Sequence, residues 1–236
     1  MVSEENPFLG WRGIRFTLDH PEIFLTQLRA LLRADAEIGN LRILLPMVSQ
    51  LGEVDEALGL LDRALEELAE EGVEHRRPPV GAMVEVPSMV YQAAALARRV
   101  DFLSVGTNDL TQYLLAVDRN NSRVAGLYES LHPAVLHALR EVVTAAHAAG
   151  CPVSVCGEMA GDPAAALLLV GMGVDTLSIS ASSIPRIKWL VRTVEVSRAR
   201  QLLAEAMTME DPVAIREMLV AALDRYGLGG LVRAGK

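Results

Sequence analysis

Several carboxylate and amide side chains stand where short apolar segments of this chain end. Glu85 closes one such segment, and Asn108 and Asp109 follow another within residues 106–112, GTNDLTQ. Mg²⁺ takes one or two carboxylates in proteins and leaves its other positions to water and substrate. Glu85 and Asp109 are therefore candidate magnesium ligands. The alternatives are a solvated rim position for Glu85 and a helix cap at Asn108 or Asp109.

Three arginines stand out from the others because of their surroundings. Arg12 follows Trp11 in a loop bounded by Gly and Pro. Arg42 lies in an apolar segment that we expect to be a buried strand, and Arg119 follows Asp118 in a polar loop. The planar fork of arginine matches phosphate and carboxylate, so three converging arginines would suit a small anionic substrate. Stacking of Arg12 on Trp11 and a surface pair of Arg119 with Asp118 are the alternatives.

Two cysteines lie near one expected strand, at positions 151 and 156. Residues five apart on a strand point to opposite faces and lie roughly 16 Å apart, so Cys151 and Cys156 cannot form a disulfide. Cys156 precedes Gly157 and Glu158 at the carboxyl end, where a thiol could act as an acid; buried packing explains it equally well. The histidines show no metal-binding spacing.

Alternating strands and helices must position these residues. The apolar runs predict strands that are buried on both faces, at 41–47, 80–86, 100–106, 151–157 and 174–180. Apolar periodicity and Pro or Asp start signals predict helices at 21–34, 52–71, 88–99, 133–149, 162–170, 195–207 and 212–225. Strands that alternate with helices lie parallel and are joined by right-handed crossovers.

A doubly wound sheet and a (β/α)₈ barrel both fit this alternation. Polar residues follow the carboxyl end of strand after strand, which favours the TIM-type barrel, because barrel enzymes build their sites there. We count about five of the eight strands, so we expect an incomplete barrel with a helical carboxyl-terminal tail. The expected division is residues 1–193 for the barrel portion and 194–236 for the tail.

Composition excludes several classes of protein. The 236 residues carry 22 Lys+Arg and 30 Asp+Glu, a formal charge of −8, which argues against a nucleic-acid-binding protein. The first ten residues do not resemble a signal peptide, and no apolar run is long enough to span a membrane. With only two cysteines, a reducing compartment and a cytoplasmic location are expected.

Five motifs together resemble a known family. They are NPFLGWR at 6–12, RILLPM at 42–47, MVEVP at 83–87, GTNDLTQ at 106–112 with Asp118 and Arg119 after it, and CGEMAG at 156–161. In this order they resemble the phosphoenolpyruvate–protein phosphotransferases (enzyme I) of the bacterial phosphotransferase system, in their carboxyl-terminal substrate-binding barrel. The sequences of residues 12–25 and 118–125 resemble the nitrogen-branch members of the family more closely than the sugar-branch members.

The resemblance implies a role for each candidate residue. Glu85 and Asp109 match the magnesium ligands, and Cys156 matches the acid that protonates the enolate carbon of pyruvate. The residues that match the phosphoenolpyruvate-binding positions are Arg12, Arg42, Asn108, Asp109 and Arg119. Guanidinium groups and Mg²⁺ would neutralise the phosphoryl oxygens and the developing enolate.

Two parts of the family pattern do not occur in this sequence. The phospho-accepting histidine belongs to a separate amino-terminal domain, and the first barrel strands would precede Asn6. We therefore expect phosphoryl transfer to a histidine on another domain and then to a phosphocarrier protein, with a homodimer as the native form and little full turnover by this chain alone. The alternatives are a phosphoenolpyruvate synthase, dikinase or aldolase-like barrel, and a non-catalytic dimerisation module.

Overall fold

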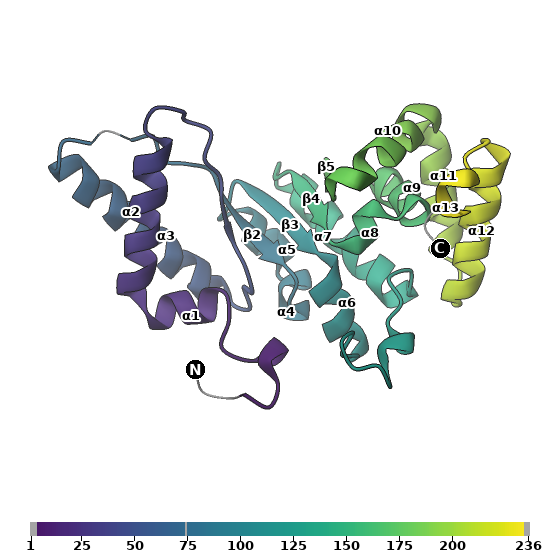
Figure 1. Cartoon of the computed structure of the whole chain (residues 1–236), viewed down its shortest axis with the longest axis horizontal. Helices are drawn as coiled ribbons and strands as arrows, with labels where there is room; N and C mark the ends of the chain where they lie inside the picture. Colours follow the sequence, from purple (N-terminus) through teal and green to yellow (C-terminus); the bar gives the residue numbers. More distant parts are fainter. Residues whose placement is uncertain (1–3, 74, 234–236) are drawn as a thin grey trace.

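Five parallel strands form one sheet at the centre of the molecule (Figure 1). The computed structural model describes residues 4–73 and 75–233. The strands are β1 (Ile43–Leu45), β2 (Val80–Val84), β3 (Phe102–Gly106), β4 (Val153–Cys156) and β5 (Thr176–Ser178). Their spatial order, β1-β2-β3-β4-β5, is the order along the chain. A doubly wound sheet would reverse direction at a switch point, so the sequential order supports the barrel prediction.

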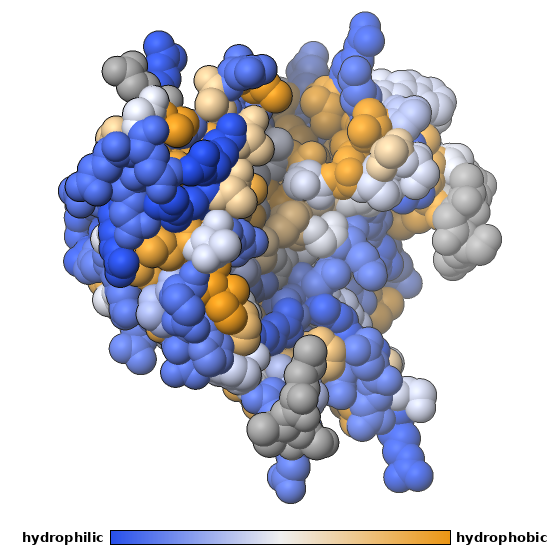
Figure 2. All heavy atoms as spheres, turned by 60° about the vertical axis from the view of Figure 1, so that its left-hand side comes forward, coloured by the Kyte–Doolittle hydropathy of each residue, from blue (hydrophilic) through white to orange (hydrophobic). Residues whose placement is uncertain are grey.

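The two faces of the sheet differ. Side chains alternate along each strand, and every second one packs into the core: Ile43, Leu45, Val80, Ala82, Val84, Leu103, Val105, Val153 and Val155. The opposite, inner face carries Met83, Ser104, Ser154 and Cys156, most of them only partly buried. Figure 2 shows a hollow near the centre of one face of the molecule. The inner face of the sheet is therefore the polar, more open one.

Helices and short 3-10 turns connect the strands. They are η1 (Pro7–Leu9), α1 (Ile14–Asp19), α2 (Pro21–Asp35), α3 (Leu51–Glu70), α4 (Pro87–Val90), α5 (Ala93–Ala97), α6 (Thr107–Leu115), η2 (Ala125–Leu127), α7 (Pro133–Ala148), α8 (Glu158–Gly161), α9 (Pro163–Met172), η3 (Ala181–Ser183), α10 (Ile184–Thr193), α11 (Val196–Ala206), α12 (Pro212–Arg225) and α13 (Gly230–Arg233). No helix in the described part of the chain is both long and apolar enough to cross a membrane.

Most predicted helices are confirmed, and one is wrong. The segment 88–99 is not a single helix, because it divides into α4 and α5 at Tyr91 and Gln92. The Ser88 hydroxyl donates to the Ser49 carbonyl oxygen at 2.9 Å, so Ser88 ties α4 to the loop after β1. The helix α10, which the sequence analysis did not predict, follows β5 and its 3-10 turn.

The carboxyl-terminal helices pack on α9. This helix is apolar on all sides, and its residues Ala164 to Leu169 are all buried, as expected for a helix surrounded by other elements. At Gly171 a Cβ atom would lie 2.5 Å from the Ala199 carbonyl oxygen of α11, so glycine permits this close helix contact. The division of the chain at residue 193 stays a prediction.

Candidate active site

Asp109 lies between two arginines at the carboxyl end of β3. It belongs to the first turn of α6 and is only 7% exposed. Arg119 Nη1 donates to Asp109 Oδ1 at 3.0 Å, and Arg12 Nη2 lies 3.5 Å from Asp109 Oδ2. Both guanidinium groups also lie over the Phe8 ring, 5.6 and 5.7 Å from its centroid. The structure thus brings Arg12 and Arg119 together, although they are far apart in the sequence.

The alternative readings of these arginines are wrong. Trp11 packs edge-to-face against Phe16 and His20, with ring centroids 4.9 and 5.2 Å away, while Arg12 lies over Phe8. Arg119 pairs with Asp109, as described above, and the Asp118 carboxylate accepts from the Asn120 N–H. Both guanidinium groups are therefore held at the carboxylate of Asp109.

Glu85 is buried beside Asp109. It follows β2, is 4% exposed, and its Oε1 accepts a hydrogen bond of 2.6 Å from the Met47 N–H. Met47 has φ +61°, a left-handed conformation that is rare for a residue with a side chain. A Cβ atom at Gly106 would lie 2.9 Å from Glu85 Oε2, so glycine on β3 leaves room for this carboxylate. The solvated rim position for Glu85 is therefore wrong.

The environment of Glu85 favours its neutral form unless a cation is present. Burial is the main cause that raises the pKa of Glu85, and the neighbouring Asp109 raises it further. The hydrogen bond from the Met47 N–H lowers the pKa of Glu85, and the resulting value is about 7. Two carboxylates side by side in a buried position suit a divalent cation, which would favour their charged forms. The described residues contain no group of three or more His, Cys, Asp or Glu side chains that could hold a metal. Two carboxylates with substrate and water fit Mg²⁺.

Asn108 has one defined partner in the next loop. Its Oδ1 accepts a hydrogen bond of 3.0 Å from the Glu158 N–H at the start of α8. The Asn108 amide group therefore keeps its N–H donors for other partners. The helix-cap reading of Asn108 and Asp109 is wrong, because Gly106 occupies the N-cap position and both residues lie inside α6.

Gly157 allows the loops after β3 and β4 to meet. It has φ +102°, and a Cβ atom there would lie 2.4 Å from Thr107 Oγ1 and 2.7 Å from Asn108 Oδ1. In the same contact, the Thr107 hydroxyl donates to the Cys156 carbonyl oxygen at 2.7 Å. A side chain at Gly157 would therefore displace the Asn108 amide.

Replacement of Gly157 by alanine is expected to destabilise the fold and to move Asn108. Gly150 provides the matched control, since it also has positive φ (+72°) but no atom lies within 4 Å of its Cβ position. Backbone strain should cost about 1–2 kcal/mol in Gly150→Ala. In Gly157→Ala it should cost about 1–3 kcal/mol, because φ +102° with ψ −179° is a conformation found almost only in glycine, and only this variant adds the clash. Urea unfolding compares the two variants. Equal losses of unfolding free energy would contradict the predicted contact.

Cys156 ends β4 on the inner face of the sheet. It is the register partner of Gly106, and its Sγ lies 3.4 Å from the Val105 carbonyl oxygen and 3.6 Å from Ser104 Oγ. Burial is the main cause that raises the pKa of the Cys156 thiol. Cys151 is buried before the amino end of the same strand, and both thiols are free. Cys156 therefore lies on the strand next to the one that leads to Asp109.

Arg42 does not join this group. The predicted position inside a buried strand is wrong, because Arg42 is exposed and precedes β1. Its guanidinium lies 5.7 Å from the centroid of the Phe102 ring, at the amino end of β3. The register pairs Ile43 with Val80, so Arg42 and Glu85 are separated by roughly 20 Å of strand rise. An arginine side chain does not span that distance.

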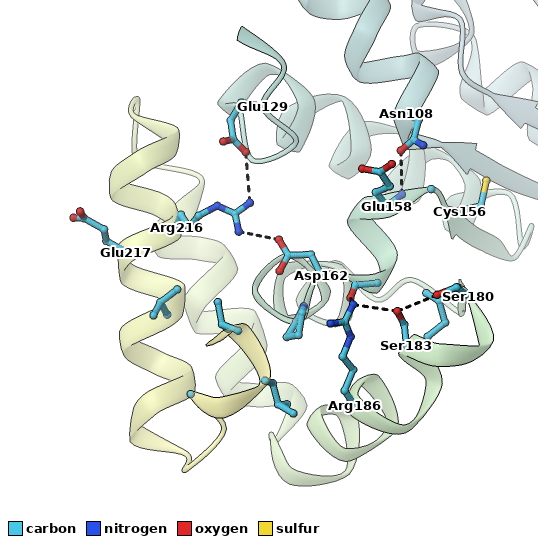
Figure 3. A pocket seen from close by; sticks show the side chains of 18 of the residues that line it. Asn108, Glu129, Cys156, Glu158, Asp162, Ser180, Ser183, Arg186, Arg216 and Glu217 are labelled. Atoms are coloured by element: carbon cyan, nitrogen blue, oxygen red, sulfur yellow. Dashed lines mark hydrogen bonds and ion pairs between the residues drawn. The ribbon is translucent and has the colours of Figure 1, made fainter. Parts of the chain in front are cut away.

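A cavity of about 1250 Å³ opens next to Cys156 (Figure 3). Asn108, Cys156 and Glu158 lie at one end of it. Towards the other end, Arg216 Nη1 donates to Asp162 Oδ2 at 2.9 Å, and Arg186 donates to Ser183 Oγ at 3.1 Å. Arg186 and Arg216 were not predicted as site residues, because each lies within a helix and no motif surrounds it in the sequence. Only the packing of α10 and α12 around the cavity reveals them.

The comparisons with known proteins agree with the motifs. A family model described as "PEP-utilising enzyme, PEP-binding domain" matches residues 1–196. The chain belongs to this family. Its resemblance to the phosphoenolpyruvate–protein phosphotransferases is thereby confirmed.

Curated relatives of this chain are longer proteins. "Phosphoenolpyruvate-dependent phosphotransferase system" from Escherichia coli K12 is 53% identical over 235 residues, which are 99% of this chain and 31% of that protein. "Phosphoenolpyruvate-protein phosphotransferase" from Haemophilus influenzae is 46% identical over 220 residues, covering 93% of this chain and 38% of that protein. The chain therefore spans about a third of the length of these relatives.

A solved structure supports the fold of this chain. A citrate lyase from Burkholderia xenovorans superimposes with a TM-score of 0.52 at 19% identity, covering 86% of this chain and 69% of that one. At this identity the likeness concerns the fold alone. Together with the family and the sequential strand order, it confirms the TIM-type barrel class, of which the described residues contribute five strands.

Proposed function

We propose that this chain binds phosphoenolpyruvate together with Mg²⁺ and carries out the pyruvate-forming half of a protein phosphotransfer reaction. The phosphoryl group would pass to a histidine on another domain and then to a phosphocarrier protein. The observation that carries the proposal is the buried Asp109 carboxylate, held between Arg12 and Arg119. The named relatives support the same reaction.

The arginines retain capacity for a substrate. Each guanidinium has five N–H donors, and one donor of each contacts Asp109, at 3.5 Å for Arg12 and 3.0 Å for Arg119. Their side chains are 37% and 29% exposed, so donors remain available at the surface. A phosphate or carboxylate group can therefore bind to them without breaking the contacts with Asp109. The Asn108 amide adds a neutral donor.

The carboxylates of Glu85 and Asp109 would hold the metal ion. When bound, Mg²⁺ neutralises charge on the phosphoryl oxygens and on the enolate oxygen that develops as the phosphoryl group leaves. Burial of both carboxylates supports this role, because a hard dication offsets the cost of two adjacent negative charges.

Cys156 would complete the reaction. Its S–H bond breaks and the proton forms a new C–H bond at C3 of the enolate, whose electron pair enters that bond; pyruvate and a thiolate result. The position of Cys156 at the carboxyl end of β4, on the strand next to the Asp109 loop, supports this step.

Calorimetry tests the proposal on the chain itself. We expect phosphoenolpyruvate to bind when Mg²⁺ is present and to lose measurable binding when EDTA removes the metal, because the substrate oxygens then lose the cation that would neutralise their charge. Pyruvate serves as the control, since it lacks the phosphate. Failure of phosphoenolpyruvate to bind in excess Mg²⁺ would count against a substrate site in this chain.

We also propose, on the family resemblance, that the native protein is a homodimer in the cytoplasm. Light scattering measures the oligomeric state alongside the calorimetry. A dimer that fails to bind phosphoenolpyruvate would favour the alternative of a dimerisation module.

A further inference from the structure

Ser104 is a buried hydroxyl next to the candidate site that the proposed function does not use. It lies in the middle of β3 and is 4% exposed. The register pairs it with Ser154 on β4, two residues before Cys156. Because side chains alternate along strands, Ser104, Ser154 and Cys156 share the inner face of the sheet.

The hydrogen bonds around Cys156 give its thiol a defined orientation. The Ser104 hydroxyl donates to Cys156 Sγ at 3.6 Å, within the range for a sulfur acceptor. The Cys156 S–H donates to the Val105 carbonyl oxygen at 3.4 Å. The sulfur therefore accepts one hydrogen bond and donates another, and both partners come from β3.

We propose that Ser104 is a positioning residue for Cys156, which fixes the sulfur at the carboxyl end of β4 and stabilises the thiolate that remains after proton transfer. The second part rests on the proposed function. In that step the proton leaves sulfur for C3 of the enolate, while the Ser104 hydroxyl keeps its own proton and directs it at the negative sulfur. No other bond changes at Ser104, so the step needs no further reactant.

The charges around the thiol explain why such a donor is needed. Burial raises the pKa of the Cys156 thiol most, and Glu85 after β2 and Asp109 on α6 raise it further; the Ser104 hydroxyl lowers it. Glu158, on α8, lines the same cavity as Cys156. Glu85 and Asp109 therefore disfavour a thiolate, and a hydrogen bond to a charged acceptor is about twice as strong as one between neutral groups.

Alkylation of Cys156 by iodoacetamide measures the effect without substrate. Only the thiolate reacts, so its rate reports how well the protein stabilises that form. In a Cys151→Ala background, Ser104→Ala should slow alkylation at a given pH by about tenfold, the loss expected for one hydrogen bond to a charged group. Ser154→Ala is the matched control, because the Ser154 hydroxyl donates instead to the Leu103 carbonyl oxygen at 3.3 Å.

A second pair of variants separates the hydroxyl from packing. Ser104→Thr and Ser104→Val have the same shape, and only the threonine retains the donor. We expect Ser104→Thr to react within about twofold of the unchanged chain and Ser104→Val to show the tenfold loss. Equal rates for the Thr and Val variants, or an equal loss in Ser154→Ala, would overturn the proposal.

The alkylation experiment tests the role of Ser104 independently of the calorimetry that tests the proposed function. Alkylation involves neither phosphoenolpyruvate nor Mg²⁺, so an effect of Ser104 on the thiol stands even if the calorimetry shows no substrate binding. Conversely, if phosphoenolpyruvate binds but the Ser104 variants react like the unchanged chain, the inference about Ser104 fails and the proposed function stands.

Discussion

Asp109→Asn is expected to weaken the Mg²⁺-dependent binding of phosphoenolpyruvate by at least about a hundredfold, because removal of one partner from a buried charged group leaves the others uncompensated. The substitution removes the negative charge that holds Arg12 and Arg119, at 3.5 and 3.0 Å, and one of the two proposed metal ligands. The side chain keeps its size, so the fold of α6 should persist. Calorimetry of phosphoenolpyruvate in excess Mg²⁺ measures the change.

Asp118→Asn is the control for this prediction. Asp118 lies in the loop after α6, is exposed, and accepts a hydrogen bond of 2.8 Å from the Asn120 N–H, which an asparagine side-chain oxygen can also accept. Binding by the Asp118 variant should stay within about twofold, as is usual for an exposed side chain. If both variants bind equally well, Asp109 does not hold the substrate site together.

Cys156→Ala should reduce pyruvate formation by about 10²- to 10⁴-fold, the usual contribution of a positioned acid, and leave phosphoenolpyruvate binding largely intact. Binding depends on the arginines and carboxylates after β2 and β3, whereas the thiol acts only once the enolate exists. Because this chain spans 31% of the Escherichia coli relative, turnover is best measured in a chimera in which it replaces the matching segment.

Cys151→Ala is the matched control for the thiol. Cys151 is the other free cysteine of the chain and lies before the amino end of β4, away from the site. Its removal should leave the rate of pyruvate formation unchanged in the chimera. Unchanged turnover in Cys156→Ala would remove that thiol from the mechanism, and a loss of substrate binding in the same variant would mean that it acts structurally.

Much of the fold follows from local patterns. Continuous apolar runs between turn residues predict the positions of all five strands. The prediction that both faces are buried is wrong, because the inner face is only partly buried and β5 has no buried residue. The predicted start of a helix at Asp162 is also confirmed. Asp162 is the N-cap of α9, and its Oδ1 accepts a hydrogen bond of 3.1 Å from the Ala164 N–H. Pro163 follows it at the first helical position.

Local patterns fail where distant segments decide the conformation. The segment 88–99 has helical periodicity throughout, yet Ser88 bonds to the loop after β1 and the helix breaks at Tyr91 and Gln92. Arg42 lies in an apolar segment, but β1 begins only at Ile43 and leaves Arg42 exposed against Phe102. In both cases the segment contacts a residue that is far away in the sequence.

The types of the site residues could be predicted from the sequence, but their arrangement could not. The carboxyl ends of parallel strands meet at one edge, so Glu85, Asp109 and Cys156 were expected to be near one another. That Arg12 and Arg119 both bind Asp109, and that Ser104 contacts the thiol, depends on the register of neighbouring strands and on loop conformations. Neither the strand register nor the loop conformations can be predicted from the spacing of residues along the chain.

The sequence by itself determined the strands, the family and the chemical classes of the candidate groups, since these depend on residue type and local order. Only the tertiary structure decided which groups meet. It places Arg42 at the other end of the strands from the site. It also places the Glu85 carboxylate next to Asp109, in space that is available because Gly106 has no side chain. The physical reason is that the pKa of Glu85 and the position of the arginines at Asp109 depend on burial and on nearby charges. Both arise from contacts between segments that are far apart in the sequence.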